Sequence, residues 1–177
     1  MKPTELEAQL ERLHPESFGW ALHCCGRDEM EAEDVLQTAY LRVVSGRARF
    51  EGRSSFRTWF FGVIRRTALE AGRKRRTHQE RTLRLVPEEV EDPGSPDPQG
   101  GLEGKERSRR LLEALADLSE RQREVLHLVF YQELTIAEAA EVMGVSLGSA
   151  RTHYGRGKER LRSLLLRDHR DDESTTG

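Results

Sequence analysis

Aromatic and arginine side chains are interleaved in one tract of the first half of the chain. Residues 47–76 read RARFEGRSSFRTWFFGVIRRTALEAGRKRR. Unpaired bases stack on aromatic rings while guanidinium groups hold the phosphates, so this composition is typical of a surface for single-stranded nucleic acid. Phe56, Trp59 and Phe60 also recur at helical spacing and fit a buried stripe, whereas the arginines cannot all be buried. The tract therefore predicts a nucleic-acid contact built on a helix.

A second group of residues, between 118 and 166, has the pattern of a helix-turn-helix. Three helix-capping signals divide this stretch, namely Ser119 with Gln122, Thr135 with Glu138, and Ser146. Gly144 readily adopts the positive φ of a sharp turn, and the small Ala140 lets two helices cross closely. The stretch therefore predicts three helices, the last of which begins near Leu147.

The third of these helices carries side chains suited to DNA. In a helix-turn-helix, the start of this helix reaches base edges in the major groove, and later residues contact phosphates. The residues offered in this way are Leu147, Ser149, Arg151, Thr152, His153, Arg156 and Lys158. A structural three-helix bundle with a solvated basic face is the alternative, but turn, caps and basic helix together favour DNA binding.

Cys24 and Cys25 are the only cysteines and are adjacent. Neighbouring cysteines rarely close a disulfide ring, and contiguous ligands that would include His23 suit a tetrahedral metal site poorly. We expect small core residues, no metal and no cofactor, although the sequence leaves a redox or metal role for this pair undecided.

Charge is segregated along the 177 residues, although the net charge is only −2. Residues 42–81 hold 12 basic and 3 acidic side chains, and residues 146–167 hold 6 basic and 1 acidic. Between them, residues 86–104 hold 6 acidic and no basic side chains. This pattern predicts two separate contacts with a polyanion.

No stretch of the chain approaches the length of a membrane span, and the N-terminus is too polar for a secretory signal. We therefore expect a cytoplasmic protein with no membrane insertion of its own.

Helical periodicity predicts an all-α fold of two small helical domains joined by a flexible acidic linker. The expected domains are residues 1–82 and 107–167, followed by a disordered polar tail at 168–177. The linker, 83–106, is rich in proline, glycine and acidic residues and cannot bury enough surface to fold alone. Pro15 is expected to end or interrupt the first helix.

Residues 32–44, AEDVLQTAYLRVV, predict one helix with Val35 and Leu36 facing inward. Another side carries Asp34, Gln37 and Leu41, a mixture of acid, amide and apolar groups. Such a surface fits a protein partner and an ordinary solvated helix face equally well.

Both informative stretches resemble bacterial sigma factors of the sigma-70 family. AEDVLQTAYLRV followed by FEGRSSFRTWFFGVIRR is similar to region 2, and LSERQREVLHLVFYQELTIAEAAEVMGVSLGSARTHYGRGKERLRSLL is similar to region 4. A chain with only these two regions resembles the extracytoplasmic-function (ECF) group. The resemblance implies a polymerase subunit and not an enzyme. Such a subunit recognises the minus-thirty-five and minus-ten promoter elements and melts the DNA.

The resemblance also assigns roles to residues. Those that would dock on the clamp of the largest polymerase subunit are Asp34, Val35, Leu36, Gln37, Leu41 and Arg42. Those of the loop that would accept a flipped base are Gly52, Arg53, Ser54 and Ser55. Those along the displaced minus-ten strand are Arg57, Thr58, Trp59, Arg65 and Arg66, with Arg73, Arg75 and Arg76 beyond them. The helix that begins at Leu147 would read the minus-thirty-five element.

Further partners follow from the same resemblance. They are the flap region of the second-largest polymerase subunit and an anti-sigma factor that covers the faces of residues 34–41 and 125–131. A stand-alone helix-turn-helix regulator, which binds duplex DNA without core polymerase, is the alternative function. The aromatic and basic tract argues against it, as does the lack of an α/β receiver pattern before residue 105.

The sequence departs from the family pattern at several positions. Thr67 and Ala71 stand where the family usually has Asn and Asp, and His153 stands where Arg is common. Gly155 and Gly157 lie inside the recognition helix, where each costs up to about 1 kcal/mol relative to Ala. The sequence therefore predicts an end of this helix that is either looser than usual or ordered only on DNA, and an unusual upstream promoter element.

Overall fold

The computed structural model describes residues 3–82, 109 and 111–174, and the regular elements in that part of the chain are all α-helices. This confirms the all-α prediction. The predicted linker, 83–106, lies outside the described residues. Two compact units are present: α1, α2 and α3 belong to the first, and α5, most of α6, and α7 belong to the second.

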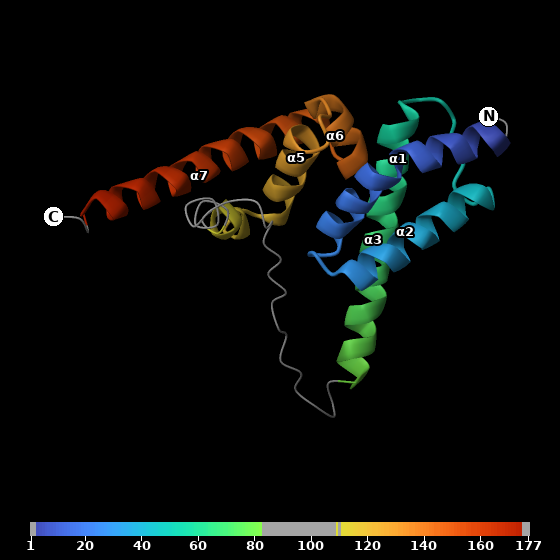
Figure 1. The fold of residues 1–177 in the computed structure, drawn as a ribbon, viewed down its shortest axis with the longest axis horizontal. Helices are drawn as coiled ribbons and strands as arrows, with labels where there is room; N and C mark the ends of the chain where they lie inside the picture. Colours follow the sequence, from blue (N-terminus) through green and yellow to red (C-terminus); the bar gives the residue numbers. More distant parts are fainter. Residues whose placement is uncertain (1–2, 83–108, 110, 175–177) are drawn as a thin grey trace. The chain divides into compact units, whose positions relative to one another are not determined.

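The N-terminal unit is a bundle of α1 (Pro3–Cys24), α2 (Glu29–Val44) and α3 (Phe56–Thr82), each of which contacts the other two (Figure 1). Asp28 caps α2, because its Oδ1 accepts a hydrogen bond from the Glu31 amide at 2.9 Å. Trp20 and Phe61 lie in the core and are joined by a 3.0 Å hydrogen bond from Trp20 Nε1 to the Phe61 carbonyl. Phe56 and Phe60 of the predicted apolar stripe are buried in this bundle, whereas Trp59 is only half-buried.

Pro15 does not end α1, which continues through it to Cys24, so the expected break is wrong. Proline in a helix interior removes one backbone hydrogen bond and leaves the carbonyl four residues earlier without its usual donor. Here both Pro15 and Glu11 lie on the exposed side of the helix, where water can solvate that carbonyl. Burial of the opposite face by Leu10 and Ser17 keeps the helix together across the proline.

The C-terminal unit contains α5 (Glu120–Phe130), most of α6 (Ile136–Met143), and α7 (Leu147–Ser174). The three predicted capping signals are confirmed. Ser119 and Gln122 form a reciprocal capping box, Thr135 and Glu138 exchange the same two hydrogen bonds, and Ser146 Oγ accepts from the Ser149 amide at 3.1 Å. Gly144 has φ +65° in the turn between α6 and α7, as expected.

Gly157 has a packing role and does not merely loosen α7. A Cβ atom at this buried position would lie 3.1 Å from Gln122 Cβ and 3.3 Å from Leu126 Cδ1, so glycine allows α5 and α7 to approach closely. Gly155 differs, because it is exposed and a Cβ there would meet nothing within 4 Å. α7 also continues to Ser174, which carries helical backbone into the segment expected to be a disordered tail. Extending a formed helix needs no new nucleus.

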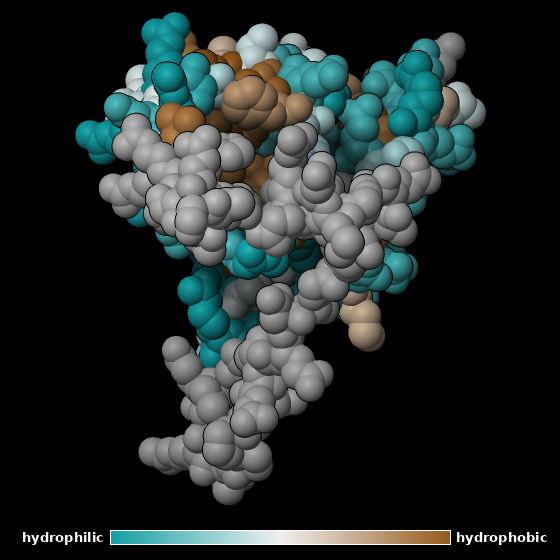
Figure 2. All heavy atoms as spheres, turned by 60° about the vertical axis from the view of Figure 1, so that its left-hand side comes forward, coloured by the Kyte–Doolittle hydropathy of each residue, from teal (hydrophilic) through white to brown (hydrophobic). Residues whose placement is uncertain are grey.

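None of the helices in the described part of the chain combines the length and the apolar character that crossing a membrane requires. On the face drawn in Figure 2, hydrophilic side chains cover much of the described surface, and hydrophobic side chains gather in a smaller area. The large hydrophobic side chains that remain exposed are Met30, Leu41, Val44, Leu69, Leu112, Phe130, Tyr131, Leu147 and Leu166.

Candidate nucleic-acid interface

A pocket of about 650 Å³ opens between the end of α2, the loop 45–55 and the first half of α3. Five arginines, two glutamates and two aromatic residues are among the side chains that line it. The lining residues are Arg42, Arg47, Ala48, Arg49, Phe50, Glu51, Arg53, Ser54, Trp59, Val63, Arg66 and Glu70. Flat apolar rings beside many donor groups suit a planar, polar ligand such as a nucleobase.

The loop that forms one wall of this pocket is anchored at both ends. At its start, the Ala48 amide donates to the Arg42 carbonyl at 2.8 Å. At its end, Ser55 caps α3, because its Oγ accepts from the Thr58 amide at 3.0 Å. Phe50 packs against Phe56 and Trp59, with ring centroids 5.4 and 5.3 Å apart. These contacts hold Phe50 and Trp59 together on the wall of the pocket.

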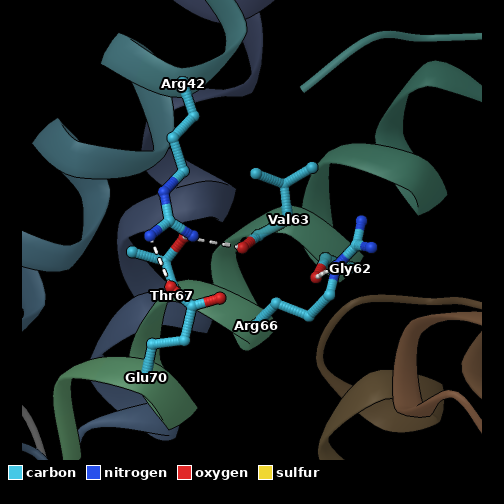
Figure 3. A network of polar contacts seen from close by, with 6 residues as sticks. All are labelled: Arg42, Gly62, Val63, Arg66, Thr67 and Glu70. Carbon is cyan, nitrogen blue, oxygen red and sulfur yellow. Dashed lines mark hydrogen bonds and ion pairs between the residues drawn. The ribbon is translucent and has the colours of Figure 1, made fainter. Parts of the chain in front are cut away.

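A polar network between α2 and α3 joins several residues that line the pocket (Figure 3). Arg42 donates to Thr67 Oγ1 at 3.2 Å and to Glu70 Oε2 at 2.5 Å. Thr67 in turn donates to the Val63 carbonyl at 2.9 Å, and Arg66 Nε donates to the Gly62 carbonyl at 3.3 Å. The hydrogen bond from Arg42 is the main cause that lowers the pKa of Glu70, so this carboxylate stays ionised at neutral pH.

The structure places part of the predicted minus-ten set at this pocket. Arg53, Ser54, Trp59 and Arg66 line it, and Gly52 has φ +71° in the adjoining turn. The residues that sequence reasoning missed are Arg47, Arg49 and Phe50. The alternation of arginine and aromatic residues in the quoted tract was the signal that could have found them.

Two of the predicted strand contacts lie in the protein interior instead. Thr58 is 1% exposed and Arg65 is 9% exposed, so neither offers its side chain to DNA in this structure. Thr58 is the first-turn residue that receives the Ser55 cap, and its hydroxyl lies 2.8 Å from Ser55 Oγ. Their assignment as surface contacts is therefore corrected: helical spacing puts Arg65 one residue after the buried Ile64, within the stripe that the bundle covers.

Other arginines of the tract bind carboxylates of the same unit. Arg57 Nε lies 2.7 Å from Glu16 Oε2, an ion pair without hydrogen-bond alignment, and its guanidinium lies over the Phe61 ring. Arg75 forms an ion pair with Glu31. Arg53 pairs with Glu51 at the exposed rim of the pocket, whereas Arg73 and Arg76 are exposed on α3.

The outer face of α2 carries a separate surface. Met30, Asp34, Gln37, Leu41 and Val44 follow one another at helical spacing and are all exposed, with Leu41 69% exposed. Three of the five are apolar, which is unusual for a solvated helix face. Sequence reasoning missed Met30 and Val44, although their positions i−4 and i+10 relative to Asp34 put them on the same face.

The remaining residues predicted for this surface have other positions. Val35 and Leu36 are buried in the bundle core, which corrects their assignment as partner contacts. Arg42 reaches across to α3, as described above.

In the C-terminal unit, the predicted DNA-facing residues of α7 are mostly exposed. These are Leu147, Ser149, Arg151, Thr152, Arg156 and Lys158, whereas His153 is half-buried. Lys158 Nζ lies 5.6 Å from the centre of the Tyr154 ring, and the same ring stacks on Phe130. Phe130 and Tyr131, at the end of α5, form an exposed aromatic pair.

Comparison with known proteins identifies the family. The sequence matches the description "Sigma-70 region 2" over residues 10–78 and "Sigma-70, region 4" over residues 108–161. The ECF RNA polymerase sigma factor SigX of Bacillus subtilis (strain 168) is 32% identical over 152 residues, which cover 83% of this chain and 78% of SigX. The chain belongs to the ECF sigma factors.

Other relatives agree with this assignment. The RNA polymerase sigma factor CarQ of Myxococcus xanthus is 32% identical over 134 residues, which cover 76% of this chain and 74% of CarQ. The sigma factor RpoE from Bartonella quintana, solved in complex with the anti-sigma factor NepR, has the same fold. It aligns with a TM-score of 0.72 at 23% identity, over 92% of this chain and 97% of that chain. The protein is thus a transcription initiation factor and not an enzyme.

The pocket lies within the region 2 match of this sigma factor, and α7 begins within its region 4 match. Thr67 and Ala71 are the two residues of region 2 that depart from the family pattern. Thr67 accepts a hydrogen bond from Arg42, and the carboxylate that also binds Arg42 comes from Glu70, one residue before Ala71.

The cysteines of this sigma factor are free thiols, both half-buried. Burial, with a smaller contribution from Glu31, raises the pKa of Cys25 to about 12. The thiol therefore stays protonated and unreactive at neutral pH. In the described residues, no group of three or more His, Cys, Asp or Glu side chains is arranged to hold a metal ion.

Proposed function

We propose that this ECF sigma factor divides promoter recognition between its two units as follows. The outer face of α2 binds the clamp of the largest polymerase subunit, the region 2 pocket captures an unstacked base of the minus-ten element, and the start of α7 reads the minus-thirty-five element. The domains are residues 1–82 and 107–167, joined by the linker 83–106 and followed by the tail 168–177. Family membership carries the proposal, and the pocket supports its central step.

Base capture would open the duplex without ATP. Unstacking one base costs a few kcal/mol, and binding of that base in the pocket offsets the cost. Phe50 and Trp59 supply rings for stacking, and Arg47, Arg49 and Arg66 supply donors for the base and its phosphates. The full set proposed for the minus-ten strand is Arg47, Arg49, Phe50, Gly52, Arg53, Ser54, Trp59, Arg66, Arg73 and Arg76.

The docking face on α2 combines Met30, Leu41 and Val44 with Asp34 and Gln37. The apolar residues provide buried area, and the carboxylate favours a partner helix that carries basic groups. Asp34 would also keep this face away from DNA, because like charges repel. Phe130 and Tyr131 are the corresponding surface of the second unit, and we assign them to the flap region of the second-largest subunit.

We further propose control by an anti-sigma factor that covers these same two surfaces. Similar structures are complexes of this kind: RpoE with NepR, and CnrH with the cytosolic domain of CnrY. CnrH aligns with a TM-score of 0.59 at 22% identity, over 91% of this chain and 88% of that chain. A factor bound there would exclude polymerase. The site of action is the cytoplasm, where polymerase and chromosome lie.

Run-off transcription on genomic promoter fragments tests the function. Core RNA polymerase is assayed with the protein, without it, and with the Leu41→Ser variant. We expect transcripts from defined start sites with the wild-type protein, fewer with the variant, and none when neither protein is added. A protein that binds duplex DNA alone, fails to bind core and starts no transcript would be a stand-alone regulator instead.

A further inference from the structure

Arg42 has a position that neither the docking face nor the DNA explains. It lies on α2 between Leu41, which is 69% exposed, and Val43, which is buried. Its side chain turns away from the docking face and crosses to α3, where it binds Thr67 and Glu70 (Figure 3). In this structure the guanidinium is thus engaged by residues of α3 and is not directed along the docking face.

Arg42 also joins the three segments that line the pocket. Its guanidinium is attached to α3, and its carbonyl accepts the Ala48 amide at the start of the loop. Arg42 itself, the loop residues and the α3 residues Trp59, Val63 and Arg66 together form the walls. Arg42 therefore contributes, together with the packing of Phe50 on Phe56 and Trp59, to the distance between the loop and α3.

Thr67 fixes the orientation of the network. Its Oγ1 donates to the Val63 carbonyl and accepts from Arg42, so both functions of the hydroxyl are used. Val63 lines the pocket on the same helix. Movement of the Arg42 guanidinium would therefore shift the pocket wall at Val63.

Glu70 neutralises the guanidinium from the other side. The Arg42 and Glu70 side chains are 29% and 42% exposed, so the pair is partly shielded from water. While it is intact, Arg42 contributes little net positive charge to a phosphate. The charged lining that remains for nucleic acid is supplied by other arginines, such as Arg47 and Arg66.

We propose that Arg42, held by Thr67 and Glu70, is a positioning residue that sets the width of the pocket, and that it does not contact the polymerase. This inference rests on the proposed role of the pocket in capturing a base. The residue acts through the loop and α3, and it does not touch the base.

The test separates core binding from promoter opening. Arg42→Met, Thr67→Val and Glu70→Gln are compared with wild type in the full chain. Binding of fluorescently labelled sigma to core gives Kd, and the change in 2-aminopurine fluorescence in the minus-ten element gives the opening rate at saturating holoenzyme. Glu113→Gln, which breaks the exposed Arg109–Glu113 pair in the other unit, is the matched control.

For Arg42→Met we expect an unchanged Kd for core and an opening rate reduced by about tenfold, as for loss of one charge-assisted hydrogen bond. The opening rates of promoters that differ only in the base at the captured position should also become more similar to one another. Glu70→Gln and Thr67→Val should show the same pattern with smaller losses, and Glu113→Gln should match wild type. Arg42→Lys keeps the charge but loses the two-pronged contact, so it should rescue opening only in part.

A parallel loss of core affinity and opening in Arg42→Met would overturn the proposal and make Arg42 a polymerase contact. Unchanged opening in all three variants would overturn it as well. If Arg42→Met does not fold, as judged by circular dichroism, the Glu70→Gln result decides. If the wild-type protein itself opens no promoter, the proposed function fails. That result is distinct from a wild-type protein that opens promoters and variants that open them equally well, which would overturn only the role of Arg42.

Discussion

The N-terminal unit and the start of α7 use arginine in different ways. In the N-terminal unit, several arginines reach carboxylates of the same unit: Arg42 with Glu70, Arg57 with Glu16 and Arg75 with Glu31. At the start of α7, Arg151 and Arg156 are exposed instead. In the proposed function, the pocket of the N-terminal unit captures an unstacked base and arginine helps to build that pocket, whereas α7 reads a duplex with side chains that it presents. The number of basic residues therefore indicates the positive charge available to DNA better at the start of α7 than in the N-terminal unit.

The largest effect should come from removing a presented arginine. Arg151→Ala should weaken binding to promoter DNA by about 1–3 kcal/mol if it contacts a base, with no change in melting temperature because Arg151 is exposed. Binding to promoters with altered minus-thirty-five elements would be measured by fluorescence anisotropy. A lowered melting temperature would show that Arg151 also supports the fold and would weaken the contrast between the units.

Two variants of α3, Arg57→Met and Arg66→Met, test the contrast between a paired and a presented arginine within one helix. Arg57→Met removes the ion pair with Glu16 and should destabilise the fold by about 1 kcal/mol, because the pair is partly buried. Arg66→Met should leave stability nearly unchanged and slow promoter opening. Thermal unfolding and opening kinetics on both variants provide the comparison. The contrast fails if Arg57→Met slows opening without loss of stability.

Substitutions of two glycines of α7, Gly155 and Gly157, should have smaller effects on stability that differ between the two sites. Gly155→Ala should stabilise the protein by about 0.5–1 kcal/mol, because Ala is the better helix former and the site is open. Gly157→Ala should gain less or lose stability, since its Cβ would crowd Gln122 and Leu126. Urea unfolding of both variants measures the difference. Equal gains would mean that α5 and α7 are not closely packed at this point.

The smallest effect concerns pH. The pKa of Glu70 is lowered mainly by the hydrogen bond from Arg42, so its ionised form stabilises the fold above its ordinary pKa of about 4.3. This contribution disappears as the pH falls below that value. It should stay under about 1 kcal/mol because the pair is partly exposed. Melting temperatures of wild type and Glu70→Gln should differ at pH 7 and converge in acid; a constant difference would assign the effect to packing.

Local features of the fold could be predicted from the sequence because their causes are local. Ser119, Thr135 and Ser146 cap helices through residues three positions away, and the turn at Gly144 follows from its backbone freedom. Helical spacing also predicted the buried stripe of α3, including Phe60.

The remainder depends on residues that are distant in sequence. Arg57 meets Glu16 across 41 positions, and Arg42 meets Glu70 across 28, so nothing in the local pattern indicated that these arginines are engaged. Pro15 was expected to break a helix that tertiary packing holds together. The family resemblance assigned Val35 and Leu36 to a partner contact, although their apolar spacing had already predicted that they face the core, where they lie.

One measurement tests the central claim, that the region 2 pocket captures a base while α7 reads the duplex. 2-Aminopurine is placed in turn at each position of the nontemplate minus-ten strand, and its fluorescence is followed in holoenzyme with wild-type, Trp59→Ala or Arg151→Ala protein. We predict a distinct signal at one position that disappears in Trp59→Ala and persists in Arg151→Ala at saturating DNA. A signal that survives Trp59→Ala, or that occurs at no single position, would contradict capture in this pocket.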